Sequence, residues 1–196
     1  FLNQGIRPVV PSRGSVGEAD ITLASHIGDA MMGEWRVIVN DKVIPAAEAL
    51  NKAGITPLDP IGKDALSILS TNAISTAYSA KAIMNAQQII DITPLVFAMS
   101  LEGLNGNISP VLPQNIAVRP FPGPADRAKD IRDTLSGSYL WEKNDTRPLQ
   151  DPLSFRTTVF VLNEAKRDLA NAQQMLSIQM NSSDDNPAVI LDASQE

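Results

Sequence analysis

The sequence predicts a mainly α-helical protein, a bundle of long helices with one small β-hairpin. Two stretches, about residues 63–92 and 156–180, repeat apolar residues at helical spacing. The hairpin is predicted from two β-rich runs, 35–39 and 42–44, that flank the turn pair Asn40-Asp41. With 196 residues and 43% hydrophobic composition, the chain can bury a sizeable core as one unit.

The other elements follow from caps and helix breakers. Asp20 is the expected N-cap of the first helix, and Gly33, Gly54 and Gly137 are expected to end helices. Pro45 should end the hairpin. The remaining predictions are helices at 21–32, 46–53, from Thr93-Pro94 through Leu104, and at 125–135, with a proline-rich crossing at 105–124.

Composition narrows the classes of partner and site. The net charge is −6, and no block of basic residues is present, so neither nucleic acid nor an anionic membrane is expected as a partner. No apolar run reaches about 18 residues, and a soluble, cytoplasmic protein is expected. With no cysteine and one histidine, the chain has no disulfide framework and no metal site of the Cys/His kind. Because it begins at Phe1, we treat it as a fragment.

A glycine turn near the start is the best place for chemistry. The run Gly14-Ser15-Val16-Gly17 places a serine hydroxyl between two glycines, whose backbones have high conformational freedom. Glu18-Ala19-Asp20 then leads directly into the first helix. The N-terminus of that helix adds free N–H donors and a positive dipole end. Glu18 and Asp20 could form a carboxylate pair for acid–base work, although capping acids explain them more simply.

Five runs of residues resemble the aromatic amino acid ammonia-lyase and aminomutase family. They cover nearly the whole chain in order, so residues 1–196 correspond to the central portion of one helical domain of such a protein. The runs are Gly14-Ser15-Val16-Gly17, Ser100-Leu101-Glu102-Gly103-Leu104, Arg119-Pro120-Phe121-Pro122-Gly123, Gln150-Asp151-Pro152-Leu153-Ser154-Phe155-Arg156 and Asn181-Ser182-Ser183-Asp184-Asp185-Asn186-Pro187.

The resemblance implies a carbon–nitrogen lyase. It implies elimination of ammonia from histidine, tyrosine or phenylalanine, as in histidine catabolism, or the related aminomutase reaction. The partner would be a small-molecule amino acid, and the protein would be a homotetramer whose subunits share each active site. The alternative is a homologue without the family's electrophile, which would act as a binding or assembly subunit or catalyse a different elimination.

The family's internal electrophile is predicted to be absent. The resemblance implies 4-methylideneimidazol-5-one, formed from an Ala-Ser-Gly tripeptide without any external cofactor, but here Gly17 is followed by Glu18-Ala19-Asp20. Ser15 is a poor substitute because β-branched Val16 hinders the attacking nitrogen. A cyclised residue omitted from the printed sequence is the alternative, but inserting one after Gly17 makes the distance to His26 too long.

Two site residues are implied near the start of the second long helix. Arg156 matches an arginine that pairs with the substrate carboxylate, a task that suits the guanidinium fork; the alternative is a surface ion pair. Gln150 matches a glutamine that lines the catalytic site; the alternative is an amide that caps a helix or makes hydrogen bonds to the backbone of its own loop. Leu153 stands where the family often has a tyrosine implicated in proton handling, so that role is lost or relocated.

Other candidates are weaker. The family's Asn-Gly-Thr aligns with Ser70-Thr71-Asn72, which makes Ser70 and Asn72 catalytic candidates, although ideal helical spacing would point their side chains apart. The alternative for both is structural packing of small polar residues against neighbouring helices. His26 could be an acid or base, but a satisfied core histidine is the simpler interpretation. Asp184-Asp185 could suggest a cation site, and a helix-ending turn is the safer interpretation.

Overall fold

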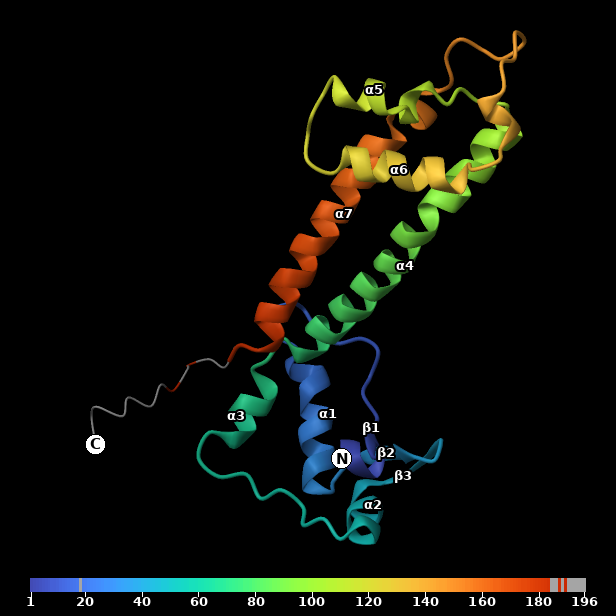
Figure 1. Ribbon diagram of the computed structural model, residues 1–196. Helices are drawn as coiled ribbons and strands as arrows, with labels where there is room; N and C mark the ends of the chain where they lie inside the picture. The colour runs from blue at the N-terminus through green and yellow to red at the C-terminus, as the bar shows by residue number, and fades with distance from the viewer. Residues whose placement is uncertain (18, 184–186, 188, 190–196) are drawn as a thin grey trace. The chain divides into compact units, whose positions relative to one another are not determined.

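A computed structural model describes residues 1–17, 19–183, 187 and 189. Glu18 and Asp184-Asp185 therefore lie outside the described residues. The chain divides into two compact units. Unit 1 comprises Phe1–Ser79 with Leu176–Glu196, and unit 2 comprises Ala80–Met175. The predicted mainly helical fold with long helices is confirmed (Figure 1).

Unit 1 combines short helices with a small sheet. Its elements are the 3-10 helix η1 (Leu2–Gln4), β1 (Arg7–Pro8), α1 (Ile21–Met32), β2 (Arg36–Val39), β3 (Lys42–Pro45), α2 (Ala46–Ala53) and α3 (Asp64–Leu69), with the ends of two longer helices. Helices α1 and α2 end at glycines in the left-handed conformation, as predicted. A buried cluster joins the sheet to both helices: Ile6, Ala30, Val37, Ala46 and Ala49.

The predicted hairpin is present and gains a third strand. Asn40 and Asp41 both have positive φ, which gives the twist that a two-residue hairpin loop requires. Strand order is β1-β2-β3, all antiparallel, with Val37 opposite Ile44 and Arg7 opposite Ile38. The short strand β1 was not predicted because its two residues are too few to show alternation.

The first long helix differs from the prediction at both ends. It breaks after α3, and α4 (Ala73–Leu104) begins after three intervening residues and continues through Pro94. At the break, Ser70 leaves the helical conformation, and the Asp20 backbone N–H donates to the Thr71 carbonyl at 2.7 Å. Pro94 lacks an N–H, but its burial with Phe97, Ala98 and Leu101 offsets the missing helical bond.

Unit 2 packs the middle of the chain around one core. It holds most of α4 and of α7 (Leu153–Met180), with η2 (Ser109–Val111), α5 (Pro113–Ala117), α6 (Pro124–Thr134) and η3 (Tyr139–Trp141) between them. Within this unit α4 and α7 lie side by side, and Gln173 donates to Gln87 across them at 3.3 Å (Figure 1). The core residues are Phe97, Ala98, Leu101, Val111, Ile116, Ala128, Ile131, Leu135, Leu140 and Val159.

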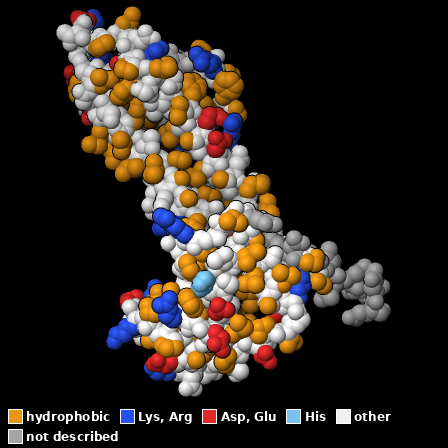
Figure 2. Space-filling model, turned by 180° about the vertical axis from the view of Figure 1, so that it is seen from behind, with side chains coloured by type: hydrophobic (Ala, Val, Ile, Leu, Met, Phe, Trp, Pro, Cys, Tyr) orange, Lys and Arg blue, Asp and Glu red, His pale blue; other side chains and the backbone are white. Residues whose placement is uncertain are grey.

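Much apolar surface of unit 2 remains uncovered. Figure 2 shows hydrophobic side chains over one face of this unit. Exposed residues of α4 and α7 include Ile89, Ile92, Leu95, Val96, Met99, Val161 and Met175. Among the described residues, the stretch Asp64–Leu104 meets the length and average hydropathy of a membrane span, with 17% of its most apolar window buried. Its apolar run is interrupted by Gln87, Gln88 and Asp91.

Candidate functional site

The glycine turn has an open backbone that two glycines make possible. Gly14 and Gly17 have φ of 140° and 91°, where other residues are strained. A Cβ at Gly14 would lie 3.2 Å from Cγ2 of Thr22, so space as well as φ favours glycine there. The Gly17 N–H donates to the Ser15 hydroxyl at 3.2 Å, and Val16 is 90% exposed. The turn thus presents its backbone to solvent ahead of Ala19 and Asp20.

Asp20 connects this turn to the start of α4. Its carboxylate accepts a hydrogen bond from the Ser75 N–H at 2.7 Å and one from the Ser75 hydroxyl at 2.8 Å. Asp20 precedes α1 as predicted, but it makes no side-chain cap bond to α1; it caps the first turn of α4 instead. The cause is the break at residues 70–72, which brings the exposed N–H groups of α4 beside it.

The ionised form of Asp20 is favoured by its hydrogen bonds. Burial alone would raise the pKa of this carboxyl, which is 2% exposed. Hydrogen bonds from the backbone and side chain of Ser75, from the Ser15 hydroxyl and from the Ile74 N–H outweigh burial and lower the pKa. Asp20 is therefore a fixed negative charge, which does not suit a general base near neutral pH.

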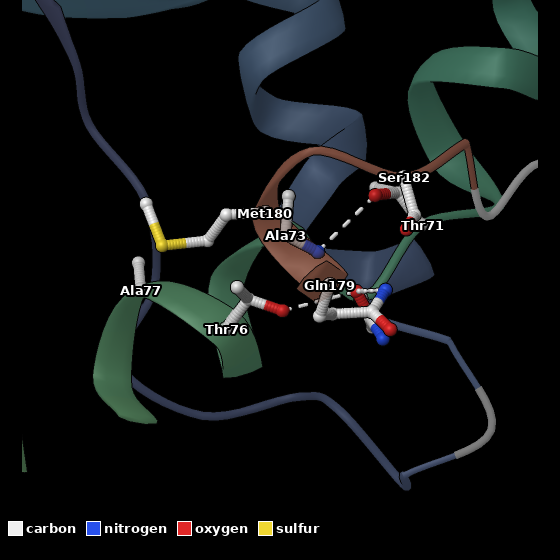
Figure 3. Close-up of a pocket in the computed structure, with 8 residues that line it drawn as sticks. Thr71, Ala73, Thr76, Ala77, Gln179, Met180 and Ser182 are labelled. Atoms are coloured by element: carbon white, nitrogen blue, oxygen red, sulfur yellow. Dashed lines mark hydrogen bonds between the residues drawn. The ribbon is translucent and has the colours of Figure 1, made fainter. Parts of the chain in front are cut away.

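Unit 1 contains a cavity of about 290 Å³, which Figure 3 shows with Thr76 and Gln179 among its labelled lining residues. Asn72 also lines this cavity. Its amide oxygen accepts hydrogen bonds from the Thr76 hydroxyl at 3.0 Å and from the Gln179 amide at 3.2 Å. The polar lining residues come from the break itself, from the first turn of α4, and from the end of α7 with the residues that follow it: Thr71, Asn72, Thr76, Gln179 and Ser182. Hydroxyl and amide groups of this kind can bind a polar, uncharged part of a ligand.

Ser70 directly precedes Thr71 in the sequence but does not line this cavity. The helical geometry that would point Ser70 and Asn72 apart does not apply, because α3 ends at Leu69 and α4 begins at Ala73. Because of the break, the direction of the Asn72 side chain is not the one that an unbroken helix would impose. Asp20, whose N–H donates to the Thr71 carbonyl, lies next to both candidates.

Arg156 lies in the first turn of α7, within unit 2. Its Nε donates to the Asp151 carbonyl at 2.9 Å, which fixes the plane of the guanidinium group. Among the described residues, no acidic side chain forms an ion pair with Arg156, so the alternative of a surface ion pair is not realised there. The two terminal nitrogens are therefore available to a planar anion.

Gln150 and Leu153 flank the same loop and are both exposed. Leu153 is the first residue of α7, with 62% of its surface accessible, and its side chain offers neither a donor nor an acceptor.

His26, in unit 1, makes structural contacts. Its Nδ1 lies 2.7 Å from the Thr22 carbonyl, and its ring packs edge-on against Trp35 with the ring centroids 4.7 Å apart. These contacts agree with a structural histidine.

The comparisons with known proteins cover the whole chain. The family described as aromatic amino acid lyase matches residues 1–196. Histidine ammonia-lyase of Geobacillus kaustophilus is 33% identical over 193 residues, 98% of this chain and 38% of that protein. The chain belongs to the aromatic amino acid lyase family.

Solved structures of lyase-family proteins share the fold. The ergothioneine-degrading enzyme ergothionase of Treponema denticola, solved with desmethyl-ergothioneine sulfonic acid, matches with a TM-score of 0.88 and 39% identity. That match covers 97% of this chain and 38% of the enzyme. Phenylalanine aminomutase of Pantoea agglomerans matches with a TM-score of 0.82 and 27% identity, over 96% of this chain and 40% of its own. This chain thus spans about 38% of the length of the curated lyases that it matches.

The candidate lyase residues fall into two groups, one in each unit. Unit 1 holds the glycine turn with Ser70 and Asn72, and unit 2 holds Gln150 and Arg156. Sequence reasoning missed Thr76 and Gln179, which bind Asn72. The spacing of Asn72 and Thr76, four residues apart, was a usable signal for the first contact; Gln179 is 107 residues from Asn72 and gave none.

Proposed function

We propose that the protein containing this chain eliminates an amine from an aromatic amino acid without using 4-methylideneimidazol-5-one. The observation that carries the proposal is the replacement of Ala-Ser-Gly by Glu18-Ala19, between Gly17 and Asp20, in a chain that otherwise matches the family throughout. No described group of His, Asp or Glu side chains has the arrangement of a metal site. The candidate site rests on amide, hydroxyl and guanidinium groups.

The missing tripeptide restricts the leaving group. An electrophile of this type assists elimination by bonding to the substrate nitrogen, which requires a lone pair on that nitrogen. A quaternary ammonium nitrogen has no lone pair and departs as a neutral tertiary amine without such help. A substrate whose α-nitrogen is fully alkylated therefore suits a lyase that lacks the electrophile.

The comparisons support this choice of substrate. Ergothionase, which degrades ergothioneine, is 39% identical to the chain, and the curated histidine ammonia-lyases are about 33% identical. Ergothioneine is a betaine of a thiol-substituted histidine, with three methyl groups on the α-nitrogen. We propose a betaine of this kind, bearing an imidazole ring, as the substrate class.

The chain's own residues have defined tasks in this elimination. Arg156 holds the substrate carboxylate through its guanidinium edge, and Gln150 of the same unit orients a polar part of the substrate. A base removes the β-proton, the C–H electron pair forms the α,β double bond, and the C–N bond breaks to release the tertiary amine. Leu153 cannot be that base, so the proton acceptor is another group of the complete protein.

Loss of ammonia is the second candidate reaction. The names of the curated relatives favour it, since they are histidine ammonia-lyases. Histidine, tyrosine or phenylalanine would then be the substrate, or an aminomutase reaction would follow. This reaction needs another source of activation for the amine, because Glu18-Ala19 has no hydroxyl to dehydrate.

We also propose that the protein is a homotetramer in which α4 and α7 pack against other subunits. The exposed apolar residues of unit 2 support this assembly, because monomers rarely leave so many in water. We assign the apolar character of α4 to packing between subunits rather than to lipid.

Product analysis tests the proposed reaction. The purified full-length protein is incubated separately with ergothioneine, histidine, tyrosine and phenylalanine, and released amine and the ultraviolet absorbance of the unsaturated acid are followed. We expect trimethylamine from ergothioneine and no ammonia from the other three. Ammonia release from a free amino acid would contradict the proposal, and binding without turnover of any of the four would favour a binding or assembly subunit.

A further inference from the structure

Asp151 is a buried acidic residue whose carboxylate accepts a hydrogen bond from another loop. It is 5% exposed, and its Oδ2 accepts a hydrogen bond from the Asn107 N–H at 2.6 Å. Acidic residues are rarely buried to this extent unless their charge is compensated by hydrogen bonds or by a partner. The hydrogen-bond partner of this buried carboxylate is therefore the backbone N–H of Asn107, 44 residues away in the sequence.

Gly106 leaves the space that this contact needs. A Cβ at this position would lie 3.0 Å from Oδ2 of Asp151 and would also overlap the side chain of Leu101. Leu101 is 1% exposed and belongs to the core of unit 2, so it cannot move aside. The absence of a side chain at Gly106 thus allows the loop to close over the carboxylate.

Asn107 holds the same segment at a second point. Its side-chain amide donates to the Leu149 carbonyl at 3.1 Å, while its Oδ1 accepts the Ser109 N–H at 2.8 Å. The second bond fixes the orientation of the amide that makes the first. Asn107 therefore binds the chain on both sides of Gln150, through Leu149 and through Asp151.

The anchored residue in turn holds Arg156. The Asp151 carbonyl accepts the Arg156 Nε–H at 2.9 Å, and Arg156 has no acidic partner among the described residues. The two polar groups of Asp151 make different contacts. Its side-chain carboxylate binds the Asn107 N–H, and its backbone carbonyl binds the Arg156 guanidinium. An Asp151 carboxylate paired with Arg156 would compete with an anionic ligand, whereas a carbonyl at Nε leaves both terminal nitrogens free.

We infer that Asp151 is a positioning residue that aims the Arg156 guanidinium at the substrate carboxylate, with Asn107 and Gly106 as its support. This inference rests on the proposed function, in which Arg156 binds that carboxylate. Asp151 itself touches neither the substrate nor the reacting atoms. Its loss should act through Arg156 and should weaken substrate binding more than it slows turnover.

Kinetics of three variants test the inference on the full-length protein. Asp151→Ala should raise KM about 10- to 100-fold with kcat changed about threefold or less. Asp151→Asn should restore most of the affinity, because its amide oxygen can still accept the Asn107 N–H. Asp145→Ala is the matched control: among the described residues Asp145 forms an ion pair with exposed Lys143 alone, in the same loop, and its removal should leave KM unchanged.

A double-mutant cycle separates positioning from general damage to the fold. If Asp151 acts through Arg156, the effects of Asp151→Ala and Arg156→Lys on KM should be far from additive, since the second change removes what the first misplaces. Gly106→Ala should reproduce the Asp151→Ala phenotype from the other side of the contact. Melting temperatures establish that each variant is folded.

A substrate-free measurement keeps this test independent of the proposed reaction. In the NMR spectrum, the Arg156 Nε–Hε signal is identified by its loss in Arg156→Lys. We expect slow exchange of this proton with water in the unaltered protein and about tenfold faster exchange or more in Asp151→Ala. Unchanged exchange in a folded variant, or additive KM effects, would overturn the inference. Absence of turnover with protected Hε would instead count against the proposed function alone.

Discussion

The carboxylate of Asp20 accepts both hydrogen bonds that Ser75 can donate, one from its backbone and one from its hydroxyl. These two residues lie 55 positions apart. The contact places the end of the glycine turn against the first turn of α4, next to Asn72. One side chain thereby joins the turn where the family forms its electrophile to the cavity that contains Asn72.

Removing this contact should destabilise the protein. We expect Asp20→Ala to lower the free energy of unfolding by about 1.5–3 kcal/mol, since it leaves the Ser75 N–H without its charged acceptor. Asp29→Ala, in the same helix, is a suitable control because its carboxylate makes no side-chain hydrogen bond or ion pair among the described residues. Denaturant titration followed by circular dichroism measures the difference. Equal midpoints for the two variants would show that the contact contributes little.

The same carboxyl should give the stability a pH dependence. Its pKa is lower when folded than its ordinary value of 3.8, so its contribution is fully present above that value. The contribution should decline as the pH falls through the lower, folded pKa. Unfolding titrations of the unaltered protein and of Asp20→Asn should therefore differ most near neutrality and converge in acid. A gap that persists unchanged in strong acid would argue against this linkage.

Substrate affinity should depend on the fork of Arg156. Arg156→Lys replaces two parallel hydrogen bonds by a point charge, and binding of the substrate or its unsaturated acid should weaken by about 1.5–3 kcal/mol. Arg167→Lys is the matched control, because Arg167 lies on α7 and pairs with Glu164 and Asp168 at the surface. Calorimetry measures both. Equal affinity of the Arg156→Lys variant and the unaltered protein would place the carboxylate elsewhere.

The intact mass should equal that of the encoded sequence. Formation of 4-methylideneimidazol-5-one removes two waters from the backbone, and the stretch from Gly17 to Asp20 has no residue suited to that cyclisation. Mass spectrometry of the purified protein decides the matter. A deficit of two waters that disappears in Ser15→Ala would restore the ordinary lyase mechanism.

The oligomeric state should depend on the exposed apolar face of unit 2. Ile92, which is 53% exposed, lines a groove of about 400 Å³ between α4 and α7. Ile92→Asp should shift a tetramer toward smaller species in light scattering, because it buries an unpaired charge at the interface. Val118→Asp, at a more exposed position that follows α5, should not. A monomer at micromolar concentration for the unaltered protein would contradict the assembly.

Helices with clear end signals were predicted almost to the residue. Gly33 and Gly54 end α1 and α2 because only a left-handed residue closes those turns, and Asn40-Asp41 fixes the hairpin locally. The predicted start of α7 at Arg156 fell three residues late, since Pro152 rather than Arg156 begins the helical hydrogen bonding.

The features that define the site depend on long-range contacts. The break at residues 70–72 looks helical in sequence, and the hydrogen bonds that Asp20 makes to Ser75 and Thr71 stabilise it from a distant part of the sequence. Continuation through Pro94 depends on burial in the core of unit 2, which no local pattern encodes. Arg156 and Gln150 were found through motif resemblance, whereas their support by Asn107 required the three-dimensional structure.

The uncovered apolar side chains of α4 and α7 also bear on how the protein reaches its native state. If the protein assembles as proposed, a newly made chain carries Ile89, Val96 and Met99 in water until other subunits bind, and such surfaces attract chaperones and promote aggregation. In the proposed assembly, completing the core and meeting the other subunits are one event. Dilution should then act on this protein much as a denaturant does, because separated subunits lose the packing that keeps them folded.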